Sequence, residues 1–84
     1  MISSVLQDIL SREYDSLHTG KGSTNPDLSG YTAKEIDECV NRVVYSVWMS
    51  AGDTRYNSDG WRETTSSFKK SLASARPDLF SLWF

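Results

Sequence analysis

Eighty-four residues, a net charge of −2, one cysteine and one histidine restrict the classes to which this chain can belong. The length suffices for one domain with a modest core, and we expect residues 1–84 to form a single helical domain. The charge provides neither the basic face of a typical nucleic-acid-binding protein nor the dense acidic surface of a DNA mimic. One cysteine and one histidine allow no intramolecular disulfide and no zinc cluster, so we expect no metal and no cofactor.

The apolar residues are too dispersed for a membrane segment. No apolar run approaches the roughly 18 residues that a spanning helix needs. Met1 leads into a stretch that contains Asp8, Arg12 and Glu13, which differs from the basic and apolar regions of a signal peptide. A lone cysteine is typical of a reducing compartment. We therefore expect a cytoplasmic protein that does not bind membranes.

The first predicted helix covers about residues 3–18. Ser4 and Gln7 have the spacing of a capping box at its start, and Thr19 with Gly20 indicates its end. Apolar residues recur along one side of this segment at helical spacing, which predicts an amphipathic helix. They are Ile2, Val5, Leu6, Ile9, Leu10, Tyr14 and Leu17.

The following segment, TGKGSTNPDLSG at residues 19–30, has the composition of a loop. Its Gly20–Thr24 part is a candidate phosphate site, because glycines let backbone N–H groups converge on an anion and Lys21 and the hydroxyls add donors. The candidate phosphate-binding residues are Lys21, Gly22, Ser23 and Thr24. The G-x-x-x-x-G-K-[ST] spacing is absent and no strand precedes the loop, so a flexible linker explains the composition equally well.

The second predicted helix covers residues 33–51 and has the clearest start. Thr32 and Glu35 form a T-x-x-E capping box, and Tyr31 and Ile36 occupy the two positions of a hydrophobic staple. The apolar face that follows has helical periodicity. It consists of Ile36, Cys39, Val40, Val43, Val44, Val47 and Trp48.

The third predicted helix covers about residues 60–75, after a polar loop at 52–60. Its narrower apolar stripe comprises Trp61, Thr65, Phe68, Leu72 and Ala75. Pro77 ends this helix and pushes Arg76 out of helical geometry. Residues 78–84 can then form a short helical turn, started by the proline.

The end of the sequence, Leu79–Phe84, is unusually apolar, because five of its six residues are large and apolar. We expect an all-α fold: a small bundle of three main helices (about 3–18, 33–51 and 60–75) with the second helix at its centre. The short C-terminal apolar segment packs back as a cap. Trp48 and Trp61 continue the apolar faces of the helices, whereas Trp83 belongs to the end segment, which is either a lid on the core or an interface with a partner.

Candidate chemistry is sparse. Cys39 lies on the apolar face of the second helix, where a thiol acts as a small buried hydrophobe. His18 lies at the end of the first helix, where a protonated imidazole would interact favourably with the helix dipole. Neither residue has a recognisable acid, base or nucleophile beside it in the sequence, so we expect no enzyme.

The leading hypothesis is a small non-enzymatic regulator, adaptor or inhibitor that binds another protein through an aromatic-rich surface. Compact inhibitors encoded by phages and mobile elements have this size and composition. The expected anchors are Phe80, Trp83 and Phe84. The expected rim contacts, if the 52–60 loop neighbours the end segment, are Arg55, Tyr56 and Arg62.

Three other kinds of partner stay open. A second copy of the chain would make a homo-oligomer. A phosphate-bearing nucleotide, sequestered at the Gly20–Thr24 loop, is the first alternative function. A helical nucleic-acid-binding regulator is the second, with Arg62, Lys69, Lys70 and Arg76 on the third helix and after it. The acidic net charge and the long second connection argue against nucleic acid.

Overall fold

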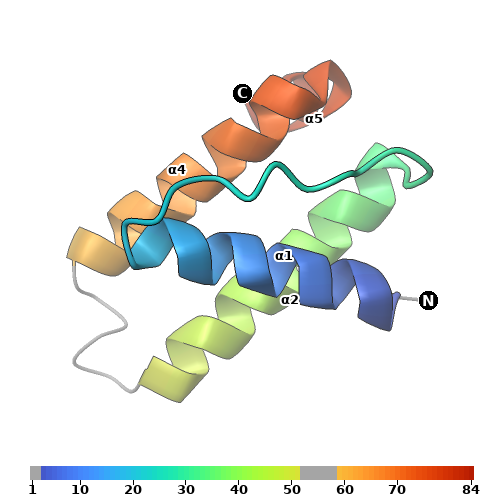
Figure 1. Ribbon diagram of the computed structural model, residues 1–84. Coiled ribbons are helices and arrows are strands. Elements are labelled where there is room, and N and C mark those ends of the chain that lie inside the picture. Colours follow the sequence, from blue (N-terminus) through green and yellow to red (C-terminus); the bar gives the residue numbers. More distant parts are fainter. Residues whose placement is uncertain (1–2, 52–58) are drawn as a thin grey trace.

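The computed structural model describes residues 3–51 and 59–84, and the regular structure in these ranges is entirely helical. Three long helices are followed by a short C-terminal helix that packs against them (Figure 1). Their bounds are Ser4–His18 for α1, Ala33–Ala51 for α2, Asp59–Ala75 for α4 and Pro77–Trp83 for α5. The all-α prediction with three main helices and a C-terminal cap is therefore confirmed at this level.

The three long helices contact one another mainly through α1. This helix packs against both α2 and α4, and Figure 1 shows it lying across them, while α5 packs against α4 and α2. The sequence predicts the second helix at the centre, but the contacts do not single it out, since α4 also packs against both α1 and α5. Tyr14 of α1 links the long helices, because its ring contacts Trp61 and Phe68 of α4 while its hydroxyl accepts a hydrogen bond from Trp48 of α2.

The start of α1 differs by one residue from the prediction. Ser3, in extended conformation, is the N-cap, and its Oγ accepts a hydrogen bond from the backbone N–H of Leu6 at 3.2 Å. Ser4 is already helical, so the predicted box of Ser4 and Gln7 is wrong. The cap must precede the first helical residue, because only a non-helical backbone lets its side chain turn back to the exposed N–H groups.

The end of α1 has the hydrogen bonds of a Schellman motif. The N–H of Lys21 donates to the carbonyl of Ser16 at 2.9 Å, and the N–H of Gly20 donates to the carbonyl of Leu17 at 3.3 Å. Gly20 has a φ of 80°, a conformation that glycine adopts without steric cost. The predicted helix end at Thr19 and Gly20 is confirmed.

The capping box at the start of α2 is confirmed. Glu35 accepts a hydrogen bond from the N–H of Thr32 at 3.0 Å, and Thr32 Oγ1 accepts one from the N–H of Glu35 at 3.1 Å. Hydrogen bonding from Thr32 to the Glu35 carboxylate, first from its backbone N–H, lowers the pKa of this carboxyl. Of the predicted staple, Ile36 is buried in the hydrophobic cluster and Tyr31 is partly buried against that cluster.

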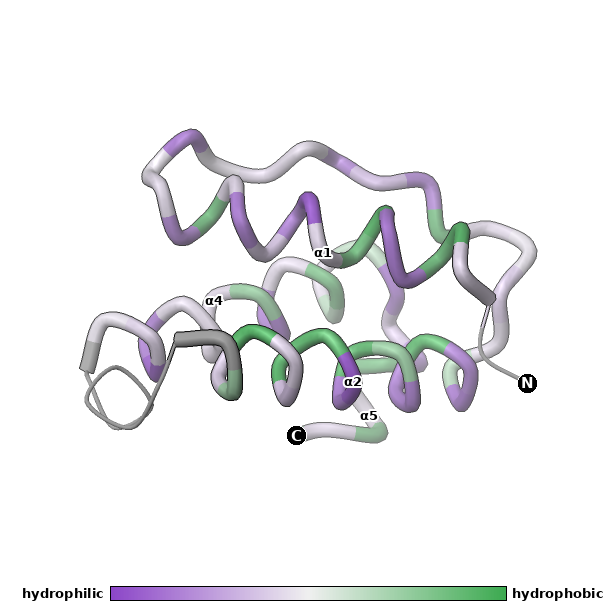
Figure 2. The backbone as a smooth tube through the Cα atoms, turned by 90° about the horizontal axis from the view of Figure 1, so that it is seen from below, coloured by the Kyte–Doolittle hydropathy of each residue, from purple (hydrophilic) through white to green (hydrophobic). Residues whose placement is uncertain are grey.

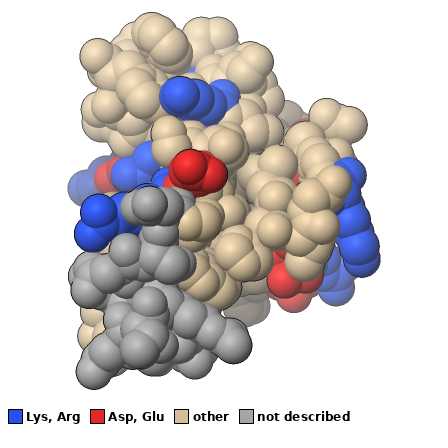
Figure 3. All heavy atoms as spheres, turned by 90° about the vertical axis from the view of Figure 1, so that its left-hand side faces the viewer, with Lys and Arg blue, Asp and Glu red and all other residues tan. Residues whose placement is uncertain are grey.

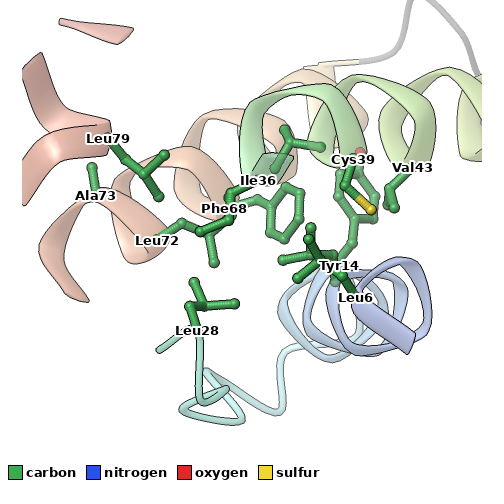
Figure 4. Packing of buried hydrophobic residues seen from close by; sticks show 12 residues of the cluster. Leu6, Tyr14, Leu28, Ile36, Cys39, Val43, Phe68, Leu72, Ala73 and Leu79 are labelled. Atoms are coloured by element: carbon green, nitrogen blue, oxygen red, sulfur yellow. The ribbon is translucent and has the colours of Figure 1, made fainter. Parts of the chain in front are cut away.

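The core joins α1, α2, α4, α5 and the first loop (Figure 4). Leu28 is the loop's contribution and Leu79 is that of α5, and Figure 4 shows Leu79 near Ala73 at one end of the cluster. The remaining buried hydrophobic side chains of this cluster are Leu6, Leu10, Tyr14, Ile36, Cys39, Val40, Val43, Phe68, Leu72 and Ala73. The C-terminal segment thus takes part in the protein's own core.

The helices are amphipathic. Figure 2 shows α1 alternating between hydrophobic and hydrophilic residues along its length, whereas the connection that follows it is mostly hydrophilic or neutral. Within residues 3–51 and 59–84, no helix is long and apolar enough to cross a membrane.

Candidate functional site

The helix α5 begins at a sharp break in the chain. Arg76 has an extended backbone (φ −132°, ψ 97°) and Pro77 is the first helical residue, as the sequence predicts. The Arg76 guanidinium donates from Nη1 to the carbonyl oxygens of Leu28 and Tyr31, at 2.8 and 2.9 Å. The break between α4 and α5 is therefore fastened to the loop that precedes α2.

The same guanidinium also holds the first turn of α5. Its Nε and Nη2 donate to the two carboxylate oxygens of Asp78, at 3.1 and 2.7 Å. This fork geometry adds directional constraint to the charge attraction. The hydrogen bonds from Arg76 lower the pKa of Asp78. One arginine thereby fixes the direction in which α5 leaves α4.

One side of α5 closes the core. Leu79 is fully buried. Trp83 is half-buried, and its Nε1 donates to Asp37 of α2 at 2.7 Å. The ammonium of Lys69 lies 5.9 Å from the centre of the Trp83 ring, within cation–π range. Trp83, predicted as an anchor for a partner, therefore contacts this chain's own α2 and α4.

The other sides of α5 are exposed. Phe80 and Phe84 keep 58% and 62% of their surface in solvent, and their ring centres lie 5.4 Å apart, one helical turn from each other. Leu82 is 53% exposed. It lies on a different side of the helix from the two phenylalanines, because residues two apart do not face one another. Two of the three predicted anchors are thus displayed to solvent.

A groove runs between the phenylalanines and α4. It encloses about 380 Å³ and is lined by Lys70, Ala73, Ser74, Phe80 and Phe84, which we call the α4–α5 groove. The two small residues of α4 leave the space, and the two phenylalanines border it. Lys70 is exposed and makes no ion pair with any residue that the structure describes. The groove is therefore apolar with one cationic border.

The predicted rim residues do not gather at this groove. Arg55 and Tyr56 lie outside the described residues. Arg62 lies in the first turns of α4, whereas the groove lies near its last turns. The helical rise alone separates Arg62 from Lys70 by about 12 Å. The structure therefore does not bring Arg62 together with the anchors.

The candidate phosphate loop, Gly20–Thr24, donates hydrogen bonds to the carboxylate of Glu13 on α1. Glu13 is completely buried, and its carboxylate accepts hydrogen bonds from Ser23 Oγ at 2.8 Å and from the N–H of Thr24 at 2.7 Å. The Thr24 hydroxyl donates as well, at 3.3 Å. Lys21 is exposed, and Gly22 offers its carbonyl to the Ser16 hydroxyl at 2.6 Å. Two of the four candidate residues thus direct their donors at Glu13.

Sequence reasoning overlooked Glu13. A signal was present, because Glu13 follows Leu10 by three residues and precedes Leu17 by four, which places it on the apolar face of the helix. A carboxylate in that position is buried at high cost unless donors reach it. The hydroxyls and N–H groups of a polar loop nearby in sequence were the available donors.

The lone histidine belongs to an aromatic cluster between α1 and α4. The His18 ring stacks on Trp61 with 4.0 Å between centres, and its Nδ1 lies 2.9 Å from Thr64 Oγ1. The Thr64 hydroxyl donates to the carbonyl of Gly60 at 2.8 Å, so its oxygen is left to accept from Nδ1–H. His18 therefore fastens the C-terminal end of α1 to the first turns of α4.

The lone cysteine is also engaged in packing. Cys39 is buried in the core, and this burial raises the pKa of its thiol. A raised pKa leaves less of the reactive thiolate at neutral pH. These features agree with the prediction of a small buried hydrophobe.

The basic residues do not form one face in the view of Figure 3. Lys and Arg side chains there lie in separate groups with acidic groups between them. Arg76 is engaged with Asp78 and two carbonyls, and Lys69 lies over Trp83. Lys69 and Arg76, which belong to the nucleic-acid hypothesis, thus have partners within the protein.

Metal-ligating side chains are dispersed too. Across residues 3–51 and 59–84, no three His, Cys, Asp or Glu side chains gather in a way that could hold a metal ion. Among the described candidate residues, Ser23, Thr24 and Trp83 have partners within the chain, and we take the α4–α5 groove as the candidate functional site. Comparisons of the chain with protein-family models, with curated proteins and with solved structures find no match.

Proposed function

We propose that this protein is a non-enzymatic regulator, adaptor or inhibitor that binds another protein through the α4–α5 groove, with Phe80 and Phe84 as anchors. The observation that carries the proposal is the apolar character of α5 on more than one side. A helix that is apolar all round is normally buried all round. The chain covers the side with Leu79 and Trp83 and leaves the phenylalanines in solvent.

The energetics favour a partner at this place. Fully burying a phenylalanine side chain contributes roughly 1.5–3 kcal/mol. Two adjacent rings therefore form a compact source of binding free energy, and aromatic residues in pockets are typical anchors of interfaces. Exposed contiguous apolar patches commonly mark such interfaces.

Trp83 has a different role in this proposal. Its indole N–H is bonded to Asp37 and its ring lies near Lys69, so it holds α5 against α2 and α4. It is a positioning residue: it sets the place of Phe80 and Phe84 without having to contact the partner. A Trp83→Phe variant keeps most of the apolar contact and removes the hydrogen bond, which we expect to loosen the groove.

The remaining candidate chemistry supports a binding protein more than an enzyme. The Cys39 thiol is buried, and His18 is stacked on Trp61 and bonded to Thr64. The phosphate alternative gains no support, because Ser23 and Thr24 donate to Glu13. We therefore propose protein binding and not phosphate binding.

The experiment compares three immobilised proteins in the capture of partners from cell lysate: the wild type, the double variant Phe80→Ala/Phe84→Ala and the control Tyr45→Ala. Tyr45 is a matched control because it is an aromatic residue, 67% exposed, on α2. We expect the wild type and the control to retain the same protein and the double variant to lose it, with helical circular dichroism unchanged in all three. Identical retention by all three proteins would refute the proposal.

A further inference from the structure

We propose that residues 22–27, which we call the strap, open as a unit while the helices stay folded, and that the buried carboxylate of Glu13 is the latch that holds the strap closed. The strap belongs to the connection between α1 and α2, which runs back along α1 in the views of Figure 1 and Figure 2. Its opening does not involve the α4–α5 groove and is therefore independent of the proposed function.

The latch uses both oxygens of one carboxylate. Ser23 Oγ donates to Oε2 of Glu13 at 2.8 Å, and Thr24 donates to Oε1 from its N–H at 2.7 Å and from its hydroxyl at 3.3 Å. Glu13 is completely buried, and the ion pairs among the residues that the structure describes do not include it. A buried carboxylate without a cation depends on hydrogen-bond donors. The strap and Glu13 therefore hold each other in place.

Beyond the latch, the strap lies mostly in solvent. Its residues are exposed, except for Pro26, which is half-buried. A hollow of about 400 Å³ lies between the strap and the last turns of α4, bordered by Asn25 and Pro26 on one side and by Ser71 and Ser74 on the other. Opening would release mainly polar groups to water and uncover little apolar surface. Segments with these properties are the ones that open locally in folded proteins.

Both ends of the strap are anchored, which limits the opening to these residues. Before the strap, the N–H groups of Gly20 and Lys21 donate to carbonyl oxygens of α1. After the strap, Leu28 is buried in the core, and its carbonyl accepts a hydrogen bond from Arg76. The groups that orient α5 thus remain in place when the strap opens.

The backbone of the strap and the latch support each other. Gly22 and Asn25, on either side of the latch donors, have φ values of 87° and 52°, a region that glycine enters freely and asparagine at modest cost. The N–H of Asn25 donates to Ser23 Oγ at 3.1 Å, the same atom that donates to Glu13. The Ser16 hydroxyl donates to the carbonyl of Gly22 at 2.6 Å. Because these bonds share atoms and turns, we expect them to break together.

The test follows hydrogen exchange of backbone amides by NMR on the isotope-labelled full chain at increasing urea concentrations. The amides of Thr24 and Asn25 report on the strap, and those of Phe68 and Leu72 report on the core. We expect similar protection factors for the two strap amides, at least about tenfold lower than those of the core. The strap amides should respond weakly to urea and the core amides strongly, because the urea dependence scales with the surface exposed.

Two variants connect the protection of the strap to the latch. Glu13→Gln keeps the size of the side chain and removes its charge, and Ser23→Ala removes one donor at an exposed position. Each should lower the protection factor of Thr24 at least about fivefold, and by a larger factor than that of the core amides. The controls Glu38→Gln and Ser66→Ala make the same changes at exposed positions of α2 and α4 and should leave Thr24 unchanged.

Four results overturn the inference: strap amides that follow the core amides at every urea concentration, strap amides without measurable protection, widely different protection of Thr24 and Asn25, or a protection factor of Thr24 that neither latch variant changes. The first would mean that the strap opens only when the whole protein unfolds. None of these measurements involves Phe80 or Phe84, so the capture experiment of the preceding section decides the proposed function separately.

Discussion

Two groups of aromatic residues at opposite ends of α4 have different surroundings. In the first, Tyr14, His18, Trp61 and Phe68 pack between α1 and α4, and the Tyr14 hydroxyl bonds to Trp61, Thr65 and Trp48. In the second, the Phe80 and Phe84 rings contact each other and remain mostly in solvent. Similar residue types therefore serve the fold in one place and are available to a partner in the other.

The comparison shows that the partners of an aromatic residue decide its role. Tyr14 and His18 in the first group have side-chain polar atoms that find partners within the chain, which fixes their geometry. The phenylalanines in the second have no polar atom, and the described residues leave more than half of their surface in solvent. The following changes test this distinction.

The largest expected effect is on stability, at Phe68. This side chain is fully buried at the centre of the first group. Phe68→Ala should lower the free energy of unfolding by roughly 3–5 kcal/mol, because it removes apolar contacts and leaves a cavity. Urea denaturation followed by circular dichroism measures this. A loss below about 1 kcal/mol would show that the cluster does not stabilise the fold.

A smaller effect is expected from Tyr14→Phe, which keeps the ring and removes the hydroxyl. The hydroxyl lies 3.2 Å from the carbonyl of Trp61, 3.0 Å from Thr65 Oγ1 and 3.4 Å from Trp48 Nε1. Its loss should cost about 1–2 kcal/mol. The same denaturation experiment decides, with Tyr45→Phe at an exposed position as the control. An equal result for the two variants would contradict the importance of these bonds.

At Phe84 the expected change in stability is small. Phe84→Ala should alter the free energy of unfolding by less than about 0.5 kcal/mol, because the ring is 62% exposed. The contrast with Phe68→Ala is the sharpest test of the comparison, since the substitution is the same. A loss as large as that at Phe68 would mean that Phe84 belongs to the fold and not to an interface.

The smallest effect concerns acid stability at Asp78. Its pKa is lowered in the folded protein, so its carboxylate stabilises the fold above its ordinary pKa, and this contribution is lost as pH falls through the folded pKa. The urea midpoint of the wild type should therefore exceed that of Asp78→Asn at pH 6, and the two should converge as the pH falls through the folded pKa of Asp78. A difference that stays constant over this range would exclude the ion pair with Arg76 as its cause.

The helices and their ends were predictable because their signals are local. The capping box of Thr32 and Glu35 has its partners three residues apart, and α2 has the predicted bounds. The N-cap of α1 was misplaced by one residue, since Ser3 and Ser4 are both suitable caps and the choice depends on the backbone.

The connections between elements were not predictable from the sequence. Trp83 bonds to Asp37 across 46 residues, and Arg76 to Leu28 across 48. No local pattern indicates such pairs. For the candidate site, Phe80 and Phe84 were identified from their apolar character alone, but the groove with Ala73 and Lys70 required the placement of α5 on α4.

The hydrogen bonds of Arg76 to Leu28 and Tyr31 make the α4–α5 groove a property of the whole fold. The residues that line the groove all lie between Lys70 and Phe84, yet the direction of α5 depends on a loop from the first half of the chain. An isolated peptide of the last two helices would lack the carbonyls that orient the guanidinium. A partner that recognises the groove would thus distinguish the folded protein from its fragments, so that binding reports the completion of folding.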